Sequence, residues 1–193
     1  MLTVIPFRAG GKSRLPEELR REVSLAMLGD VVEVAVAVGE VRVVTDDAAG
    51  RLVASDLGAR LIDDPGEGQG EAVAAGLKGA EGLCLVVNAD VPRIRASDLN
   101  ALAVPALLGK LAIVEARDGT TNALGLPRGD VFQPLYGARS AGQFRAHALA
   151  LGLEFEELTL PNLVHDVDTL LDLERVGSRA GSRTAEMLDA ISR

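Results

Sequence analysis

Residues 83–92 read LCLVVNADVP, and this stretch decides the fold class. Its first part, from Leu83 to Asn88, is apolar almost throughout, which is typical of a strand buried on both faces of a parallel sheet. Its second part, from Asn88 to Pro92, places Asp90 just after that strand. Because ligands of open α/β sheets bind at the carboxyl ends of the strands, we expect this carboxylate at the mouth of a binding site. A turn or a helix cap is the alternative interpretation.

The alternation of short apolar runs with helical spacing extends outward from this stretch in both directions. Further strands are predicted over residues 2–6, 41–45, 60–62, 111–116, 122–126 and 154–158, and residues 131–136 are expected to be extended. Helices are predicted over residues 17–38, 46–57, 71–78 and 140–151, from residue 97 or 98 to a point before Pro105, and from Thr169 onward. This order indicates a single α/β domain over residues 1–193, with a mostly parallel sheet covered on both faces.

The composition excludes several classes of function. The 193 residues include 20 Lys and Arg against 28 Asp and Glu, a net charge of −8, and only 3% are aromatic. An acidic chain without a basic block or stacking aromatics is not expected to bind nucleic acid. The single cysteine, Cys84, excludes an internal disulfide, and no Cys/His cluster supports a zinc site.

The hydrophobic segments are all short. None approaches the ~20 apolar residues that a membrane-spanning helix needs. The apolar run within MLTVIPFRAGGK, at residues 1–12, is too short for a signal peptide. We therefore expect a cytoplasmic protein without a membrane partner.

A basic, glycine-containing loop, RAGGKSRL, follows the first strand at residues 8–15. Glycines allow a phosphate to approach the backbone, and Lys12 and Arg14 can neutralise its charge. Only two glycines precede Lys12, so the strict spacing of a P-loop ATPase is not met. A solvated basic turn is the alternative.

An alternating pair of carboxylates occurs near the C-terminus, where residues 165–169 read HDVDT. In an extended segment Asp166 and Asp168 point to the same side. Together with Asp90 they would form a cluster for a divalent cation, since Mg²⁺ prefers carboxylates combined with substrate phosphates. Thr169 and Asp172 fit a helix cap, so a polar helix entry is the alternative.

Two further segments carry groups that can hold a small anion. Residues 118–124 read DGTTNAL, which ordinary turn chemistry also explains. Residues 136–140 read YGARS and lead into a predicted helix, whose N-terminus would attract an anion. Ser140 and Gln143 fit a capping box.

Taken in order, the motifs KSRL, ADVP, TTNAL, YGxxS and DVDT resemble one known family. These are the guanylyltransferases that act on 2-phospho-L-lactate or phosphoenolpyruvate in coenzyme F-420 biosynthesis. The resemblance extends from about Ile5 to about Leu173. TTNAL and YGxxS are its specific part, because the other motifs also occur in related nucleotide transferases, including those of molybdenum cofactor. The resemblance implies a single-domain, Rossmann-like three-layer sandwich of the nucleotide-diphospho-sugar-transferase type.

The resemblance also implies roles for charged residues. Lys12 and Arg14 would hold the phosphates of GTP. Asp90 and Asp168 would bind Mg²⁺, with Asp166 as a further candidate ligand.

Uncharged residues would hold the two substrates. Thr121, Gly137 and Ser140 would bind the phosphorylated three-carbon acid. Gly68 and Gly70 would lie in the glycine-rich loop that contacts the nucleotide, and with so few aromatics in the chain the base is expected to be recognised by such backbone groups.

The sequence departs from the family pattern at three positions. The loop Gly68-Gln69-Gly70 stands where relatives usually read GLN, so the usual Asn is absent, and Asn88 stands where a further acid is expected. Phe144 occupies a position that is often His, and His147 follows three residues later, within reach of the same helix face.

The implied reaction joins GMP to the phosphate of the acceptor acid and releases pyrophosphate. The attacking phosphate oxygen is already ionised at neutral pH, so no general base is required. Two alternatives stay open at this point: another nucleotidyltransferase, of the molybdenum-cofactor or sugar-phosphate type, and a non-catalytic nucleotide-binding module. The first would need room for a larger acceptor, and the second has no use for three metal-binding carboxylates.

Overall fold

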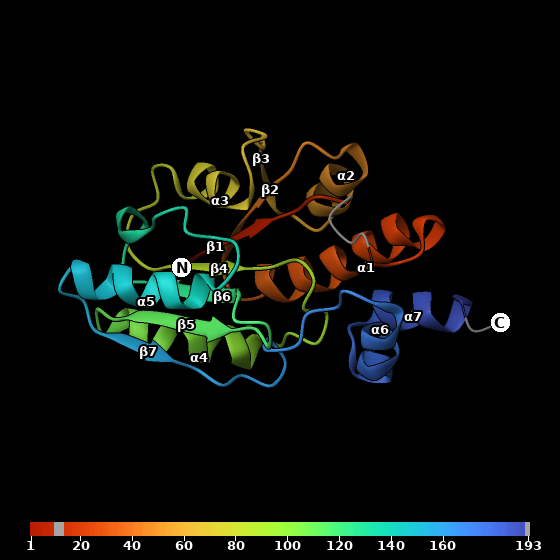
Figure 1. The fold of residues 1–193 in the computed structure, drawn as a ribbon. Helices are drawn as coiled ribbons and strands as arrows, with labels where there is room; N and C mark the ends of the chain where they lie inside the picture. The colour runs from red at the N-terminus through yellow and green to blue at the C-terminus, as the bar shows by residue number, and fades with distance from the viewer. Residues whose placement is uncertain (10–13, 192–193) are drawn as a thin grey trace.

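The computed structural model describes residues 1–9 and 14–191 (Figure 1). Within them one sheet has the strand order β3-β2-β1-β4-β6-β5-β7. The strands are β1 (Leu2–Pro6), β2 (Glu40–Val44), β3 (Arg60–Ile62), β4 (Cys84–Val87), β5 (Leu111–Glu115), β6 (Thr121–Leu126) and β7 (Phe155–Glu157). Strand β6 is antiparallel to β4 and β5, whereas every other pairing is parallel. The predicted mostly parallel sheet is confirmed.

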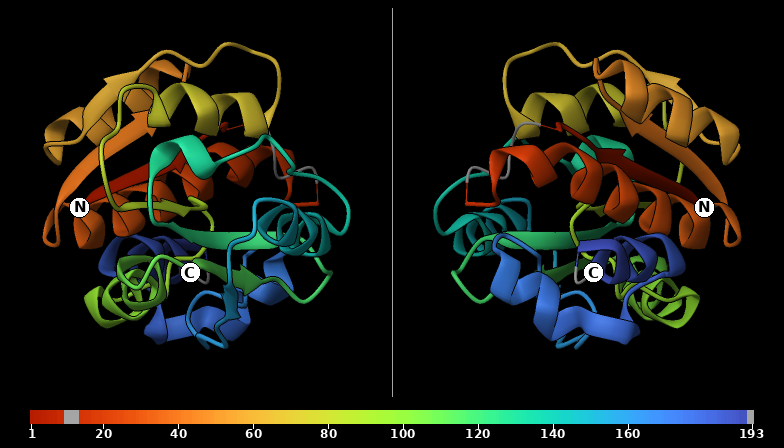
Figure 2. Two further views of the ribbon diagram at one scale, coloured as in Figure 1. Left: turned by 90° about the vertical axis from the view of Figure 1, so that its left-hand side faces the viewer. Right: turned by 90° about the vertical axis from the view of Figure 1, so that its right-hand side faces the viewer.

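Helices cover both faces of this sheet (Figures 1 and 2). One face carries α1, α2 and α4, and the other carries α3 and α5. The helices are α1 (Glu17–Val36), α2 (Ala48–Asp56), α3 (Gln69–Leu77), α4 (Ala96–Leu107), α5 (Ser140–Ala150), α6 (Leu170–Val176) and α7 (Ser182–Ile191). Two 3₁₀ turns, η1 (Gly129–Val131) and η2 (Gly177–Arg179), complete the elements. The result is the predicted three-layer sandwich.

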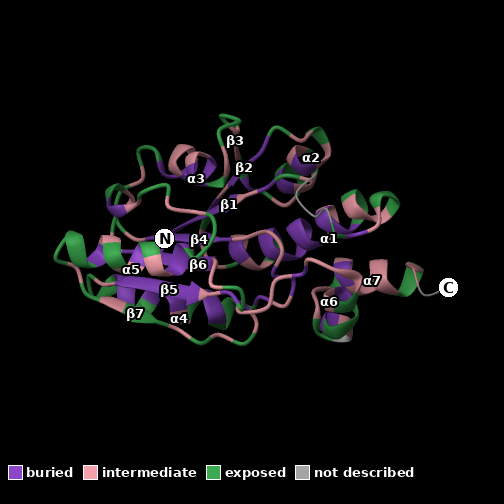
Figure 3. Cartoon of the chain, viewed as in Figure 1, coloured by how far each residue is buried: buried purple, intermediate pink, exposed green. Residues whose placement is uncertain are grey.

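The apolar character of β4 follows from its place in the middle of the sheet. Leu85 and Val87 are buried in the core beneath α1 and α4, whereas Cys84 and Val86 are buried in the core beneath α3 and α5. Figure 3 shows the same burial along the neighbouring strands. A strand with both faces covered needs an apolar residue at every position, which is why this stretch indicated the fold.

The C-terminal segment packs against α1, a helix from the N-terminal part of the chain. Val167 and Leu173 share a third buried cluster with Val23 and Met27 of α1. Helices α6 and α7 therefore lie beside α1, as Figures 1 and 2 show. None of the described helices combines the length and the apolar character that crossing a membrane requires.

Two local predictions were wrong. Helix α4 does not end before Pro105 but continues to Leu107; a proline in the last turn removes only its own amide, and the ring of Pro105 is buried against the core. The second concerns Ser140, which lies inside helix α5 rather than capping it. In the segment expected to be extended, Val131 ends a 3₁₀ turn and the backbone of Phe132 is extended.

Candidate active site

The site lies where the carboxyl ends of β1 and β4 meet the start of β6. Because β6 is antiparallel to β4, its first residues reach the same edge of the sheet as the turn that follows β4. This arrangement brings Asn122 next to Asn88, whose side-chain amide donates to the Oδ1 atom of Asn122 at 3.3 Å. The sheet thus gathers segments that are 30 and more residues apart in sequence at one edge.

Asp90, Asp166 and Asp168 form a carboxylate cluster at this edge. One oxygen from each lies within 4.8 Å of the other two. The backbone holds them there, because the amide of Val167 donates to the carbonyl oxygen of Asp90 at 3.0 Å. The buried side chain of Val167 packs into the hydrophobic cluster beside α1. The side chains on either side of it, those of Asp166 and Asp168, therefore point toward Asp90. The predicted convergence of the three residues is confirmed.

The chemistry of this donor set fits a hard divalent cation. Three carboxylates brought together repel one another unless a cation or proton compensates them. Oxygen ligands from carboxylates are what Mg²⁺ takes in nucleotide-binding sites, where substrate phosphates complete its coordination.

A helix cap fixes the chain just after the cluster. The Thr169 hydroxyl accepts from the amide of Asp172 at 3.2 Å, and the Asp172 carboxylate accepts from the Thr169 amide at 3.0 Å. The predicted capping pair is confirmed. The cap ends the extended segment that carries Asp168, and so limits its freedom to move away from Asp90.

A first cavity of about 290 Å³ lies on one side of the cluster. Its wall is mixed apolar and polar, formed by Pro6, Phe7, Arg8, Ser24, Met27, Asp64, Gln69, Ala72, Asn88, Ala89 and Asp90. The Arg8 guanidinium donates twice to the Asp64 carboxylate, at 2.7 and 3.0 Å. That hydrogen bonding lowers the pKa of Asp64. The side-chain amide of Gln69 donates to the Oδ1 atom of Asn88 at 2.7 Å.

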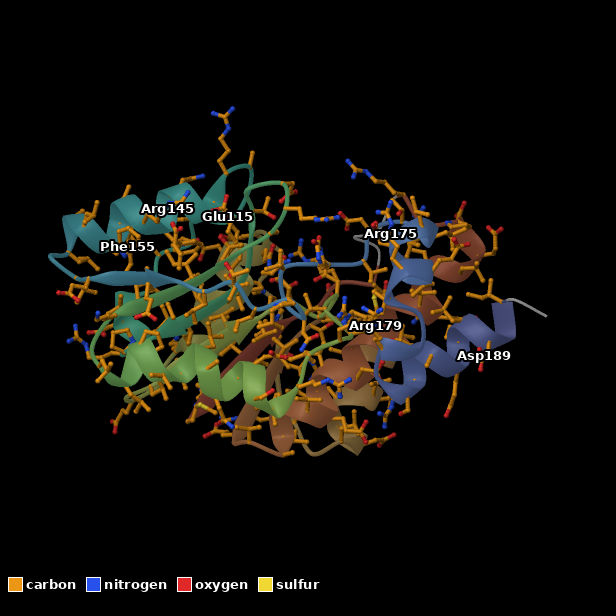
Figure 4. All side chains as sticks on the ribbon, turned by 90° about the horizontal axis from the view of Figure 1, so that it is seen from below. Glu115, Arg145, Phe155, Arg175, Arg179 and Asp189 are labelled. Carbon is orange, nitrogen blue, oxygen red and sulfur yellow. The ribbon has the colours of Figure 1, made fainter. Side chains whose placement is uncertain are left out.

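A second cavity of about 460 Å³ borders the cluster at Asp166 and Asp168. Its wall is strongly charged, formed by Arg14, Arg93, Arg117, Asp118, His165, Asp166, Asp168, Asp172, Arg175 and Val176. Figure 4 labels Arg175 on α6. Since Asp90 lines the first cavity and Asp166 and Asp168 line the second, the carboxylate cluster borders both the mixed cavity and the arginine-rich one.

Charged neighbours shift the pKa values of two residues that line the second cavity. Burial lowers the pKa of His165, and the positive charges of Arg117 and Arg93 lower it further. The Thr120 hydroxyl, by hydrogen bonding, holds the pKa of Asp118 below its usual range, and the charge of Arg14 acts in the same direction.

The residues expected to hold the acceptor acid are placed differently from the carboxylates. Thr121 and Ser140 are buried, and their hydroxyl oxygens lie 2.9 Å apart. Helix α5 begins after Arg139, which adopts a left-handed conformation with φ of 57°. Ser140 therefore hydrogen-bonds to β6 instead of capping its own helix. The side chains of Thr121 and Ser140 are thus in contact with each other. A role of these residues in acceptor binding stays a prediction.

Two glycines near the start of α3, Gly68 and Gly70, are explained by different features of the local structure. Gly68 precedes α3 with φ of +109°, and apart from its two chain neighbours no described residue has an atom within 4 Å of where a Cβ would be. A Cβ on Gly70 would instead meet Pro134 at 2.6 Å. Gly68 leaves open backbone for a ligand, whereas Gly70 allows close packing. Their contact with a nucleotide stays a prediction.

The other residues singled out from the sequence lie in different parts of the molecule. Lys12 lies outside the described residues. Arg14 lines the second cavity. Phe144 is a core residue, and the Nε2 atom of His147 lies 2.8 Å from the carbonyl oxygen of Val131, so neither lines either cavity. The part of the cavity walls formed by Asp64, Arg93 and their neighbours was missed, because no motif marks these residues.

The sequence of this chain is similar to those of known proteins along most of its length. The MobA-like NTP transferase domain matches residues 9–152. Phosphoenolpyruvate guanylyltransferases from Sphaerobacter thermophilus and Conexibacter woesei are 32% and 35% identical, over 93% and 95% of this chain and 93% and 92% of theirs. That from Streptomyces coelicolor is 34% identical over 97% of each chain. The chain belongs to the phosphoenolpyruvate guanylyltransferase family. It is therefore a nucleotidyltransferase.

Solved structures support the fold. A crystal structure from Desulfovibrio desulfuricans, described as that of a nucleotide-diphospho-sugar transferase, superposes with a TM-score of 0.78 at 17% identity, covering 99% of this chain and 94% of that one. A CMP-2-keto-3-deoxy-manno-octonic acid synthetase complexed with CTP gives 0.62 at 19% identity, with 98% of each chain covered. At these identities the likeness shows the architecture that the resemblance implied, and no more.

Proposed function

We propose that the protein transfers GMP from GTP to phosphoenolpyruvate or 2-phospho-L-lactate and releases pyrophosphate, in coenzyme F-420 biosynthesis. The observation that carries the proposal is the carboxylate cluster between two cavities of different character. The names of the relatives make phosphoenolpyruvate the first candidate acceptor.

The nucleoside is assigned to the first cavity. Its apolar residues suit a base and a ribose, and the amides of Gln69 and Asn88 supply polar groups at the wall. The open backbone at Gly68 lies next to Gln69 in the chain and supports recognition of the base by main-chain groups. Among the described residues that line this cavity, Phe7 is the one aromatic, which agrees with a base held without an aromatic sandwich.

The carboxylate cluster is assigned to Mg²⁺. Asp90 and Asp168, with Asp166 beside them, would hold the ion, which supplies charge neutralisation and alignment for phosphate groups when bound. The backbone bond between Val167 and Asp90 and the cap at Thr169 fix these carboxylates in advance. The protein thereby avoids reorganising them during the reaction.

The chemical step needs no proton transfer by the protein. An ionised phosphate oxygen of the acceptor forms a bond to the α-phosphorus of GTP. The bond from that phosphorus to the oxygen bridging to the β-phosphate breaks, and its electron pair leaves with pyrophosphate. Lys12 and Arg14 would stabilise the charge that grows on this leaving group. The remaining barrier is repulsion between anions and alignment, which positioning lowers.

A substrate panel tests the function. Pyrophosphate release is measured with GTP, ATP or CTP, each with phosphoenolpyruvate, 2-phospho-L-lactate or a sugar 1-phosphate, in the presence of Mg²⁺. We expect turnover with GTP and one of the phospho-acids. Turnover only with the sugar phosphate would assign another nucleotidyltransferase reaction. Nucleotide binding without turnover on any acceptor would contradict the proposed reaction.

A further inference from the structure

Four polar side chains form a hydrogen-bonded chain along the carboxyl edge of the sheet. The side-chain amide of Gln69, at the start of α3, donates to the Oδ1 atom of Asn88 at 2.7 Å. The amide of Asn88 donates to the Oδ1 atom of Asn122 on β6 at 3.3 Å, and the amide of Asn122 donates to the Asp166 carboxylate at 3.4 Å. We call these four residues the amide chain. It connects the wall of the first cavity with the carboxylate cluster.

The direction of the bonds in the amide chain is fixed by backbone carbonyl oxygens, which can only accept. The Nδ2 atom of Asn122 also donates to the carbonyl oxygen of Leu163 at 2.9 Å. The Nδ2 atom of Asn88 also donates to the carbonyl oxygen of Thr121 at 3.2 Å. Because both asparagines must turn their NH₂ groups toward these carbonyls, the Oδ1 atom of Asn88 is left facing Gln69. Gln69 must then present its own NH₂ group to Asn88.

Burial holds the chain in this arrangement at its far end. Asn122 is buried, and its backbone carbonyl accepts from the amide of Asn88 at 3.0 Å. Rotating the side-chain amide of Asn122 would set its oxygen against the Leu163 carbonyl and leave buried groups without partners, which costs free energy. The side chain of Gln69 is exposed by contrast. Its orientation therefore depends on the contact with Asn88.

A side-chain amide held in one orientation can distinguish the two purine bases. Guanine presents an acceptor at O6 beside a donor at N1, whereas adenine presents a donor at N6 beside an acceptor at N1. A glutamine amide carries one oxygen acceptor and one NH₂ donor group, so it can pair with either base when it is free to rotate. When it cannot rotate, it pairs with one base and opposes like groups on the other, which is a repulsive contribution to specificity.

We infer that the amide chain selects guanine over adenine by holding the side chain of Gln69 in one orientation, a role that none of the comparisons assigns to it. The inference rests on the proposed function, which places the base in the first cavity, where Gln69 and Asn88 line the wall. Gln69 would contact the base, and Asn88 would be a positioning residue. An amide at position 88, where the family resemblance leads us to expect an acid, can both accept from Gln69 and donate to Asn122.

Asn88→Ala is the variant that tests this selection. Binding of GTP and of ATP is measured calorimetrically with Mg²⁺ and without an acceptor, so that no transfer takes place. We expect the wild type to prefer GTP and the variant to narrow that preference about 10-fold, mainly through tighter binding of ATP, because the freed Gln69 amide can turn. Asn100→Ala, at an exposed asparagine of α4, is the matched control and keeps the preference. Equal weakening of both nucleotides by Asn88→Ala would overturn the inference.

Two further variants keep the inference testable if Asn88→Ala does not fold. Gln69→Leu changes an exposed side chain and should narrow the same preference about 10-fold, but through weaker binding of GTP. Asn88→Asp can still accept from Gln69, although it can no longer donate to Thr121, and should keep the preference. A preference that is unchanged in Gln69→Leu, or that is lost in Asn88→Asp, would overturn the inference.

The binding measurements separate the inference from the proposed reaction. If the substrate panel finds no turnover with any acceptor, the proposed reaction fails, but a GTP preference that Asn88→Ala narrows through tighter binding of ATP still supports the selection. If the panel finds turnover with GTP, and wild type and Asn88→Ala prefer GTP to the same degree, the selection fails and the reaction stands. A wild type that binds both nucleotides equally, or neither, would also overturn the inference.

Discussion

The amide of Val167 donates a hydrogen bond to the carbonyl oxygen of Asp90 at 3.0 Å. This single bond joins two segments that are far apart in sequence. It holds the carboxylate of Asp90 close to those of Asp166 and Asp168. A second bond, from the amide of Gly181 to the carbonyl oxygen of Pro92 at 2.7 Å, ties the same two segments together further along. The geometry of the carboxylate cluster therefore depends on how the C-terminal segment docks, and not only on the sheet.

Leu173→Ala tests that dependence. Leu173 is completely buried between the C-terminal segment and α1. Its truncation should lower the free energy of unfolding by about 2–4 kcal/mol through lost burial and a residual cavity. Urea denaturation followed by circular dichroism measures the change. A loss below about 1 kcal/mol would show that the segment contributes little to the folded state.

Asp30→Ala tests the anchor of α7. The buried Asp30 carboxylate accepts from the amides of Arg183 and Thr184, each at 3.0 Å, and so caps the helix from α1. Its removal should cost about 1–3 kcal/mol of unfolding free energy. Asp30→Asn keeps one acceptor oxygen and should lose less. Equal losses from the two variants would contradict the capping role.

The pair between Arg8 and Asp64 predicts a dependence of stability on pH. Hydrogen bonding by Arg8 lowers the pKa of Asp64 in the folded protein. A carboxyl with a depressed pKa contributes stability above its unfolded pKa and loses it as pH falls through the folded value. Because Arg8 is 44% exposed, the contribution at neutral pH is about 1 kcal/mol or less.

Asp64→Asn should therefore differ from wild type at pH 7 and converge with it below about pH 4, near the ordinary pKa of aspartate. Denaturation curves at a series of pH values provide the comparison. A difference that persists unchanged at pH 3 would exclude the ion pair as its source.

The hydroxyl pair of Thr121 and Ser140 predicts coupling between β6 and α5. Ser140→Ala leaves the buried Thr121 hydroxyl without this partner and should cost about 1–3 kcal/mol. In the double variant Thr121→Val with Ser140→Ala, the second change should cost less than it does alone, with a coupling energy of about 0.5–2 kcal/mol. Strict additivity of the two changes would show that the contact is not energetically real.

The sequence predicted those parts of the site that depend on local spacing. Asp166 and Asp168 alternate along an extended segment, and Asp90 follows the most apolar strand, so their meeting could be predicted from strand geometry. Ser140 illustrates the opposite case, because its hydroxyl has a partner on β6 that no local pattern reveals.

The arginine-rich cavity could not be predicted, for a topological reason. Arg93 follows β4, Arg117 follows β5, and Arg175 belongs to α6. They meet only because β6 inserts antiparallel between β4 and β5 and the C-terminal segment returns to the Asp90 turn. Each is an ordinary exposed or half-buried arginine when its own segment is considered alone.

Asp168→Asn in the pyrophosphate-release assay tests the central claim most directly. With GTP, phosphoenolpyruvate and Mg²⁺, loss of this proposed metal ligand should raise the barrier by several kcal/mol, a fall in kcat/KM of about 10³-fold or more. Asp56→Asn, at an exposed aspartate at the end of α2, is the matched control and should keep wild-type turnover. Near-normal turnover by a folded Asp168→Asn protein would contradict the carboxylate cluster as the reaction centre.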